Sequence, residues 1–352
     1  MQIKAQGTRH KVTGKTKGLF LVFTFAFCLF TFALPVRAQD ELEEPPPPPP
    51  LAQGGDAEGM ETIRVDTELV DLNVSVFRRG DALAAVGELG KQDFLVTENG
   101  RPEEISFFAS ASTPFDLVLL LDLSGSSAKK LNLIRKSAVE FVKAARPTDR
   151  IGIVTFAQAT TVVSPPMLDR ARLVGLIEKI EKPHDGTNFW DALSFVLKQG
   201  FGPVDASRRR AVVVMSDGVD NALPGIFGAG SSVEYEDLLE TVKASDVIVI
   251  PIYLDTEREM IKERKATPEA YELARKQLEE LAGESGSLLY KAAKMEDLEG
   301  VYQQVIRDLG TVYSIGYQPQ NRRRDGSWRT VSVRLVNRPD LAARTRRGYY
   351  AR

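Results

Sequence analysis

Apolar and polar residues follow two distinct patterns along this chain, and each predicts a different architecture. Between residues 113 and 312, unbroken apolar runs alternate with amphipathic stretches. Strands without polar alternation, separated by helices, are typical of a mainly parallel sheet covered on both faces. The apolar runs lie at 115–121, 151–156, 211–215 and 246–253, with a short strand near 287–290. The predicted helices lie at 128–145, 168–181, 188–199, 233–244, 267–283 and 295–311. We therefore predict a doubly wound α/β domain over residues 113–312.

The segments on either side of this domain have the alternation of half-buried strands. Apolar residues occupy every second position from Val70 to Val76 and again from Val331 to Leu335. Predicted strands at 94–97 and 103–108 flank Asn99-Gly100, which is a strong hairpin signal because both residues tolerate positive φ. Since two or three strands are marginally stable alone, we predict that residues 61–112 and 313–352 pack together. They would form one small β module that the α/β domain interrupts.

The first 38 residues have the pattern of a secretory signal peptide. Basic residues up to Lys17 precede an uncharged apolar stretch from Gly18 to Leu34, and Val36-Arg37-Ala38 follows. This order predicts cleavage after Ala38 and export, so that the protein is secreted, periplasmic or at the cell surface. The apolar stretch is nearly long enough to span a bilayer, so an uncleaved membrane anchor is the alternative.

Residues 39–60 form a segment that cannot bury apolar surface. Acidic residues come first, then six consecutive prolines, Pro45–Pro50, and then three glycines. A proline-rich stretch of this kind is typical of an extended, semi-rigid spacer, and a disordered tail is equally consistent with it. We predict that it separates the leader from the globular part.

Composition and charge narrow the functional classes. Cys28 is the only cysteine and lies in the leader, so disulfides, zinc-cysteine sites and thiol catalysis are excluded from the mature chain. The leader holds 6 of the 46 Lys and Arg residues and none of the 48 Asp and Glu residues, which leaves a mature charge of −8. No basic stripe remains, so we expect no nucleic-acid partner.

The most specific chemistry lies where predicted strands end. Asp122-Leu123-Ser124-Gly125-Ser126 directly follows the run 115–121, and Asp217 lies just beyond the run 211–215, in Ser216-Asp217-Gly218. Thr187 lies in the loop before the helix 188–199. Open α/β sheets bind ligands beyond the carboxyl ends of their strands, and hard oxygen donors suit Mg²⁺. The candidate metal ligands are Asp122, Ser124, Ser126, Thr187 and Asp217. Taken singly, either serine could merely cap the helix that follows, and Asp217 could merely stabilise a turn.

Taken as a set, these motifs resemble the metal-ion-dependent adhesion site of the von Willebrand factor A domain. Asp-x-Ser-x-Ser at 122–126, Thr187 in a Gly-Thr-Asn loop and Asp217 in Ser-Asp-Gly match the family's pattern. The bulky residue usual after the second serine is Ser127 here, which is not a ligand. The resemblance implies a Rossmann-like domain that binds Mg²⁺, or Mn²⁺ or Ca²⁺, and through it an acidic side chain of a protein partner.

The flanking segments resemble those of bacterial VWFA-related proteins common in acidobacteria. The matching features are Asp93-Phe94, Glu98-Asn99-Gly100, Phe108, Gly316-Tyr317, Asp325-Gly326, Arg329 and Arg347-Gly348-Tyr349. With them, the resemblance covers residues 61–352. In the family, metal ligation is coupled to movement of the last helix, here 295–311.

Three functional hypotheses follow, and no catalytic residue is assigned. The first is an exported adhesion or binding module that uses the metal to hold a partner carboxylate. The second is a Mg²⁺-dependent, phosphohydrolase-like enzyme with Asp122 as nucleophile. Such enzymes usually have a second Asp where Ser124 stands, which disfavours this hypothesis. The third is a scaffolding domain whose metal is purely structural.

Overall fold

A six-stranded sheet forms the centre of the α/β domain in the computed structural model, which describes residues 69–80, 86–124, 131–181, 186–263, 266–292 and 297–351. Its strand order is β10-β9-β8-β5-β6-β7, and all neighbours pair in parallel except the antiparallel edge strand β7. The strands are β5 (Phe115–Asp122), β6 (Arg150–Phe156), β7 (Thr160–Met167), β8 (Arg209–Ser216), β9 (Ile248–Leu254) and β10 (Tyr290–Ala292). The predicted leader and spacer lie outside the described residues.

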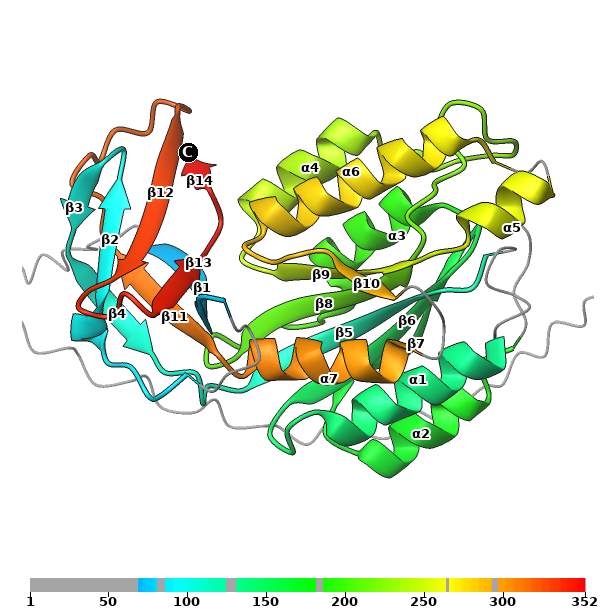
Figure 1. Ribbon diagram of the computed structural model, residues 1–352, viewed down its shortest axis with the longest axis horizontal. Helices are drawn as coiled ribbons and strands as arrows, with labels where there is room; N and C mark the ends of the chain where they lie inside the picture. The colour runs from blue at the N-terminus through cyan, green and yellow to red at the C-terminus, as the bar shows by residue number, and fades with distance from the viewer. Residues whose placement is uncertain are drawn as a thin grey trace, which may run out of the picture. The chain divides into compact units, whose positions relative to one another are not determined.

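Helices cover both faces of this sheet (Figure 1). On one face lie α1 (Leu131–Ala144), α2 (Arg170–Glu178) and α7 (Leu298–Leu309). On the other lie α3 (Phe189–Phe195), continued by a π-helical turn over Val196–Gly200, then α4 (Tyr235–Ala244) and α6 (Pro268–Glu284). Successive residues of β5 pack into opposite layers, because side chains alternate across a strand. The charged segment after β9 contains the short helix α5 (Glu257–Lys262).

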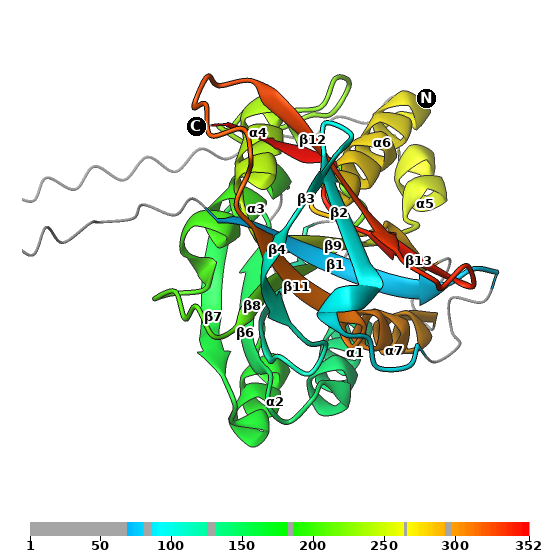
Figure 2. The same ribbon diagram turned by 90° about the vertical axis from the view of Figure 1, so that its left-hand side faces the viewer.

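The two flanking segments meet in a pair of antiparallel sheets. One sheet has the order β13-β1-β11-β4 and the other β14-β12-β2-β3 (Figures 1 and 2). Strands from before the α/β domain are β1 (Val70–Arg78), β2 (Phe94–Glu98), β3 (Arg101–Glu103) and β4 (Ile105–Ala109). Strands from after it are β11 (Val312–Tyr317), β12 (Trp328–Leu335), β13 (Leu341–Arg344) and β14 (Gly348–Tyr350). The predicted fold class, a doubly wound sheet with a β module from both flanks, is confirmed.

Local signals explain several element boundaries, and one predicted strand is wrong as a single element. Asn99 and Gly100 both have positive φ, of 47° and 79°, as their turn between β2 and β3 requires. The strand expected over 103–108 is divided: Glu103 ends β3 in one sheet, and Ile105 begins β4 in the other. The division lets one segment contribute to both sheets of the β module.

An arginine buried at the amino edge of the central sheet joins the α/β domain to the β module. Arg209 is 6% exposed, and its guanidinium lies 4.3 Å from the centre of the Phe115 ring. It donates hydrogen bonds to the carbonyls of Ala111 and Thr113, which lead into β5, and of Val312, which follows α7. One side chain therefore binds both passages of the chain between the two regions.

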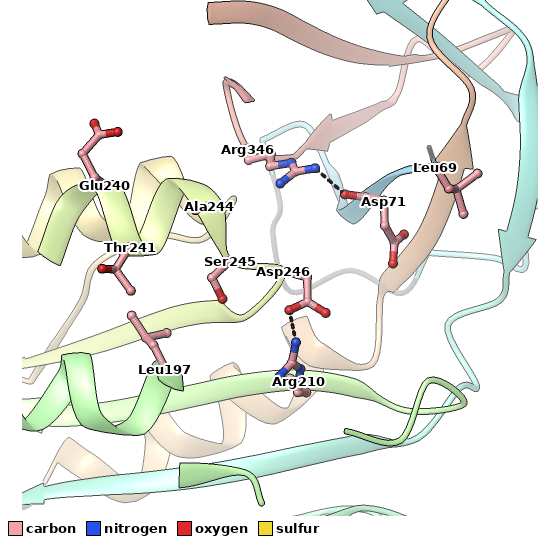
Figure 3. A pocket seen from close by; sticks show the side chains of 10 residues that line it. All are labelled: Leu69, Asp71, Leu197, Arg210, Glu240, Thr241, Ala244, Ser245, Asp246 and Arg346. Carbon is pink, nitrogen blue, oxygen red and sulfur yellow. Dashed lines mark hydrogen bonds and ion pairs between the residues drawn. The ribbon is translucent and has the colours of Figure 1, made fainter. Parts of the chain in front are cut away.

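Beside this junction, a charged cavity of about 630 Å³ lies between β1 and the amino ends of β8 and β9. Figure 3 shows Arg346 bound to the backbone carbonyl of Asp71, at 2.8 Å, and Arg210 paired with Asp246. Arg210 and Asp246 therefore balance one another within the cavity wall. Within the described ranges, no helix is both long and apolar enough to cross a bilayer.

Candidate metal centre

Asp122 lies at the carboxyl end of β5, where the sheet changes its direction of winding. β5 stands between β6 and β8. The chain passes from β5 to β6 on one side of it, and later crosses from β7 to β8 on the other. The Asp122 side chain is fully buried. Its Oδ1 accepts a hydrogen bond from the Ser124 backbone N–H at 2.8 Å, and its Oδ2 accepts one from the Ser216 hydroxyl at 2.6 Å. Ser124 itself is 2% exposed.

The end of the neighbouring strand β8 holds the second carboxylate next to the first. The Ser216 hydroxyl accepts a hydrogen bond from the Gly218 N–H at 2.9 Å. The same hydroxyl donates to Asp122, so it links the turn that carries Asp217 to Asp122. Gly218 has a φ of 75°, which glycine adopts at little cost. The Asp217 Oδ1 accepts from the Val219 N–H at 3.1 Å.

Two residues from distant parts of the chain fix the other oxygen of Asp217. Thr256, just beyond β9, donates its hydroxyl to Oδ2 at 2.5 Å, and Tyr271 on α6 donates to the same oxygen at 3.3 Å. The Tyr271 hydroxyl also lies 2.8 Å from the Thr256 oxygen, so its one hydrogen is shared between that oxygen and Oδ2. All three side chains are buried. The orientation of Asp217 is thus determined by the ends of β8 and β9 and by α6.

Backbone contacts hold the Thr187 loop against the loops that follow β6 and β8. The Thr187 carbonyl accepts from the Asn221 N–H at 2.9 Å, and the Asn188 N–H donates to the Ala157 carbonyl at 2.9 Å. Fully buried Asp220 strengthens the contact, because its Oδ2 accepts from the Trp190 N–H at 3.0 Å at the start of α3. Thr187 therefore lies at the same sheet edge as the two carboxylates.

Electrostatics favours a cation at this edge. Burial first, and then the nearby charge of Asp217, raise the pKa of Asp122 to about 7, although hydrogen bonds from Ser124 and Ser216 act in the opposite direction. Near neutral pH the two carboxylates therefore resist being ionised together. A divalent cation between them would remove this cost.

The donor set fits such a cation. Among the described residues, no group of three or more histidine, cysteine, aspartate and glutamate side chains could hold a metal. The candidate centre instead combines two carboxylates with neutral hydroxyls. All-oxygen donors of this kind match the preference of Mg²⁺ and Ca²⁺, and Mg²⁺ commonly keeps several waters.

The structure places four of the five candidate ligands at one sheet edge and adds supporting residues. Asp122, Ser124, Thr187 and Asp217 are all buried there, and Ser126 lies outside the described residues. Sequence reasoning missed Ser216, Thr256, Tyr271 and Asp220. Ser216 and Thr256 could have been found as hydroxyl residues at the carboxyl ends of apolar runs. Tyr271 has no such signal, because it lies within a helix.

The family model of the von Willebrand factor type A domain matches residues 116–304, which is more than half of the chain. The protein therefore belongs to the von Willebrand factor type A domain family. This class agrees with the doubly wound sheet and with two acidic residues at adjacent strand ends. The match begins within β5 and ends within α7.

Comparison with solved structures finds similar chains at low identity. An aerotolerance-related membrane protein from Bacteroides fragilis has 16% identity and a TM-score of 0.41, over 55% of this chain and 98% of its own. BatB from Bacteroides thetaiotaomicron has 14% identity and a TM-score of 0.39, over 55% and 98%. Proximal thread matrix protein 1 from the mussel byssus has 20% identity and a TM-score of 0.37, over 56% of this chain and 48% of its own. That structure has a zinc-occupied metal-ion-dependent adhesion site (MIDAS) motif. Comparison with curated proteins finds no match.

Proposed function

We propose that this protein is an exported binding module that holds an acidic side chain of a partner protein through a divalent cation. The cation, Mg²⁺ or alternatively Mn²⁺ or Ca²⁺, would be bound by Asp122, Ser124, Ser126, Thr187 and Asp217. When bound, it would offer a positive charge to an incoming carboxylate. Domains of this family generally act as adhesion or interaction modules, which supports this reading.

The observation that carries the proposal is the pair of buried carboxylates at adjacent strand ends. In the described part of the chain, the hydrogen bonds given to Asp122 come from a neutral amide and a neutral hydroxyl. Those given to Asp217 by Val219, Thr256 and Tyr271 are also neutral. Neutral donors orient the oxygens of Asp122 without balancing its charge, which a bound cation would do.

The residue two positions after Asp122 disfavours the hydrolase hypothesis. Ser124 stands where such enzymes usually have a second Asp that acts as acid and base. A serine cannot provide the acid–base chemistry of a carboxyl group. A scaffolding domain with a structural metal remains the second alternative, and it differs from our proposal in needing no partner.

Calorimetric titration of Mg²⁺, followed by binding of short synthetic peptides with a single Asp, separates these hypotheses. We expect wild type to bind Mg²⁺ and then the peptides, and both steps to be lost in Asp122→Asn. The Asp-to-Asn version of each peptide should not bind, and a chelator should release the bound peptides. Metal binding with no peptide binding would favour the scaffold. Hydrolysis of phosphoesters that is lost in Asp122→Asn would favour the enzyme.

Export, domain limits and the bacterial subfamily belong to the same proposal. A basic, apolar leader over residues 1–38 and a proline-rich spacer over 39–60 support export, and the flanking motifs support kinship with bacterial VWFA-related proteins. We assign the α/β domain to 113–312 and the β module to 61–112 with 313–352. N-terminal sequencing of the exported protein should start at Gln39. A start at Met1 in a membrane fraction would identify an anchor instead.

A further inference from the structure

A cavity of about 610 Å³ lies beside the candidate metal centre, between the loop that joins β6 to β7 and the last turn of α2. Its size is within the usual range of ligand pockets. Its larger apolar side chains are Leu123, Val163, Leu176 and Ile180. Leu123 and Ile180 are both 6% exposed, so the floor is part of the packed domain.

The cavity shares a wall with the metal centre. Leu123 directly follows Asp122, and its N–H donates to the Phe156 carbonyl at 2.8 Å. On the other side, Ala157 accepts the Asn188 N–H next to Thr187. Gly186 adds a third contact, since a Cβ built there would come within 3.0 Å of the Gln158 Cβ. The loops that carry the candidate ligands Asp122 and Thr187 therefore also contact residues that line the cavity.

The rim of the cavity is charged but balanced. Lys179 and Glu181 are exposed on either side of Ile180, and both line the opening. One charge of each sign, on a mature chain of net charge −8, does not suit an anionic membrane surface. An apolar floor with a mixed polar rim instead resembles the centre and edge of a protein interface.

We propose that this cavity takes a large apolar side chain from the same partner segment whose carboxylate binds the metal. The recognised motif would be an acidic residue with Leu, Met or Phe within about three residues of it, since an extended chain advances about 3.3 Å per residue. This inference rests on the proposed function. It adds a source of specificity that a metal–carboxylate contact lacks, because any exposed Asp or Glu could make that contact.

Binding of two peptide series to the protein purified after export tests the proposal by fluorescence polarisation. Every peptide has one Asp; the first series has Leu or Phe one, two or three residues away, and the second has Ala there. In Mg²⁺, we expect the best apolar peptide to bind roughly tenfold or more tightly than its Ala partner, as burial of such a side chain predicts. Leu176→Arg and Ala159→Trp, which respectively charge and fill the cavity, should abolish this difference.

The control is Leu168→Arg, which makes the same change at a 53% exposed leucine outside the cavity lining. It should keep the preference for apolar peptides, and Mg²⁺ titration should be unchanged in all three variants. If Leu176→Arg unfolds, Ala159→Trp alone decides, because Ala159 is exposed. Equal metal-dependent binding of both series overturns this inference and leaves the proposed function intact. A preference that persists in chelator or with Asn in place of Asp also overturns it, while absence of all metal-dependent binding overturns the proposed function.

Discussion

The two ends of strand β5 each bury an aspartate, but they surround it with opposite kinds of partner. At the amino end, Asp116 is 2% exposed and pairs with Arg150 and Arg208, both at 2.6 Å. At the carboxyl end, Asp122 is fully buried and receives hydrogen bonds from neutral groups among the described residues. Transfer of a charge out of water is costly unless it is compensated. Arginines of the chain itself compensate the charge of Asp116, whereas a bound cation would compensate that of Asp122.

The amino end also shows what a completed charge network does. Asp149 accepts the Phe115 N–H at 2.8 Å and pairs with Arg146 at 3.0 Å, while Arg209 binds both passages into the β module. These contacts fasten the domain to its flanks. At one edge of the sheet, charges are therefore paired within the chain; at the other, under the proposed function, a bound cation would balance them.

The largest expected effect on stability is that of Asp116→Asn, because it removes the charge that pairs with Arg150 and Arg208. Loss of one member of a buried ion pair costs about 3–5 kcal/mol, so we expect the free energy of unfolding in urea to fall by roughly 3 kcal/mol. Mg²⁺ affinity should not change, since an eight-residue strand separates Asp116 from Asp122 by about 20 Å. Asp205→Asn is the control, because this exposed partner of Arg150 should change stability much less.

The equivalent substitution at the other end of β5, Asp122→Asn, should change the free energy of unfolding in the opposite direction. Without metal at pH 8, removal of the buried charge should raise the free energy of unfolding by on the order of 2 kcal/mol. In calorimetry the same variant should lose Mg²⁺ binding. A metal-free Asp122→Asn protein that is destabilised as much as Asp116→Asn would show that the two ends do not differ as we describe.

A pH titration sharpens the contrast without any mutation. Burial and Asp217 raise the pKa of Asp122 from 3.8 to about 7, so ionisation opposes folding. The metal-free protein should therefore lose stability as pH rises through the interval between these two values. Because Mg²⁺ binds the ionised form, its affinity should rise up to about tenfold per pH unit below 7 and then level off. Titration in two buffers of different ionisation enthalpy would detect the released proton; an affinity independent of pH between 5 and 7 contradicts the assignment.

The sequence made the carboxyl edge easier to predict than the amino edge. Asp122 and Asp217 follow unbroken apolar runs, so strand ends could be located and their meeting inferred from parallel pairing. Arg209 belongs to the basic triplet 208–210, which resembles a solvated charge run, yet the fold buries it against Phe115. Nothing local signals this, because its partners lie about a hundred residues away in both directions. The edge strand β7 was missed since its exposed positions and Pro165-Pro166 hide the strand pattern.

The smallest expected effect concerns Thr256, which the sequence did not reveal as part of the site. Its hydroxyl orients Asp217 at 2.5 Å, and partners that orient a metal ligand typically change affinity by 10–100-fold when lost. For Thr256→Val, which keeps the shape of the side chain, we expect Mg²⁺ affinity to fall roughly tenfold. Tyr271→Phe should have a smaller effect, because its hydrogen bond to the same oxygen is longer, at 3.3 Å.

Thr241→Val is the matched control, since this threonine on α4 donates its hydroxyl to the Asp237 carbonyl and lines the cavity at the amino ends of β8 and β9. It should leave the Mg²⁺ isotherm unchanged. If Thr256→Val and Thr241→Val bind Mg²⁺ equally well, the carboxylate of Asp217 does not depend on its neutral donors for orientation. The carboxyl edge would then differ from the amino edge in charge alone, and not in the way its acids are positioned.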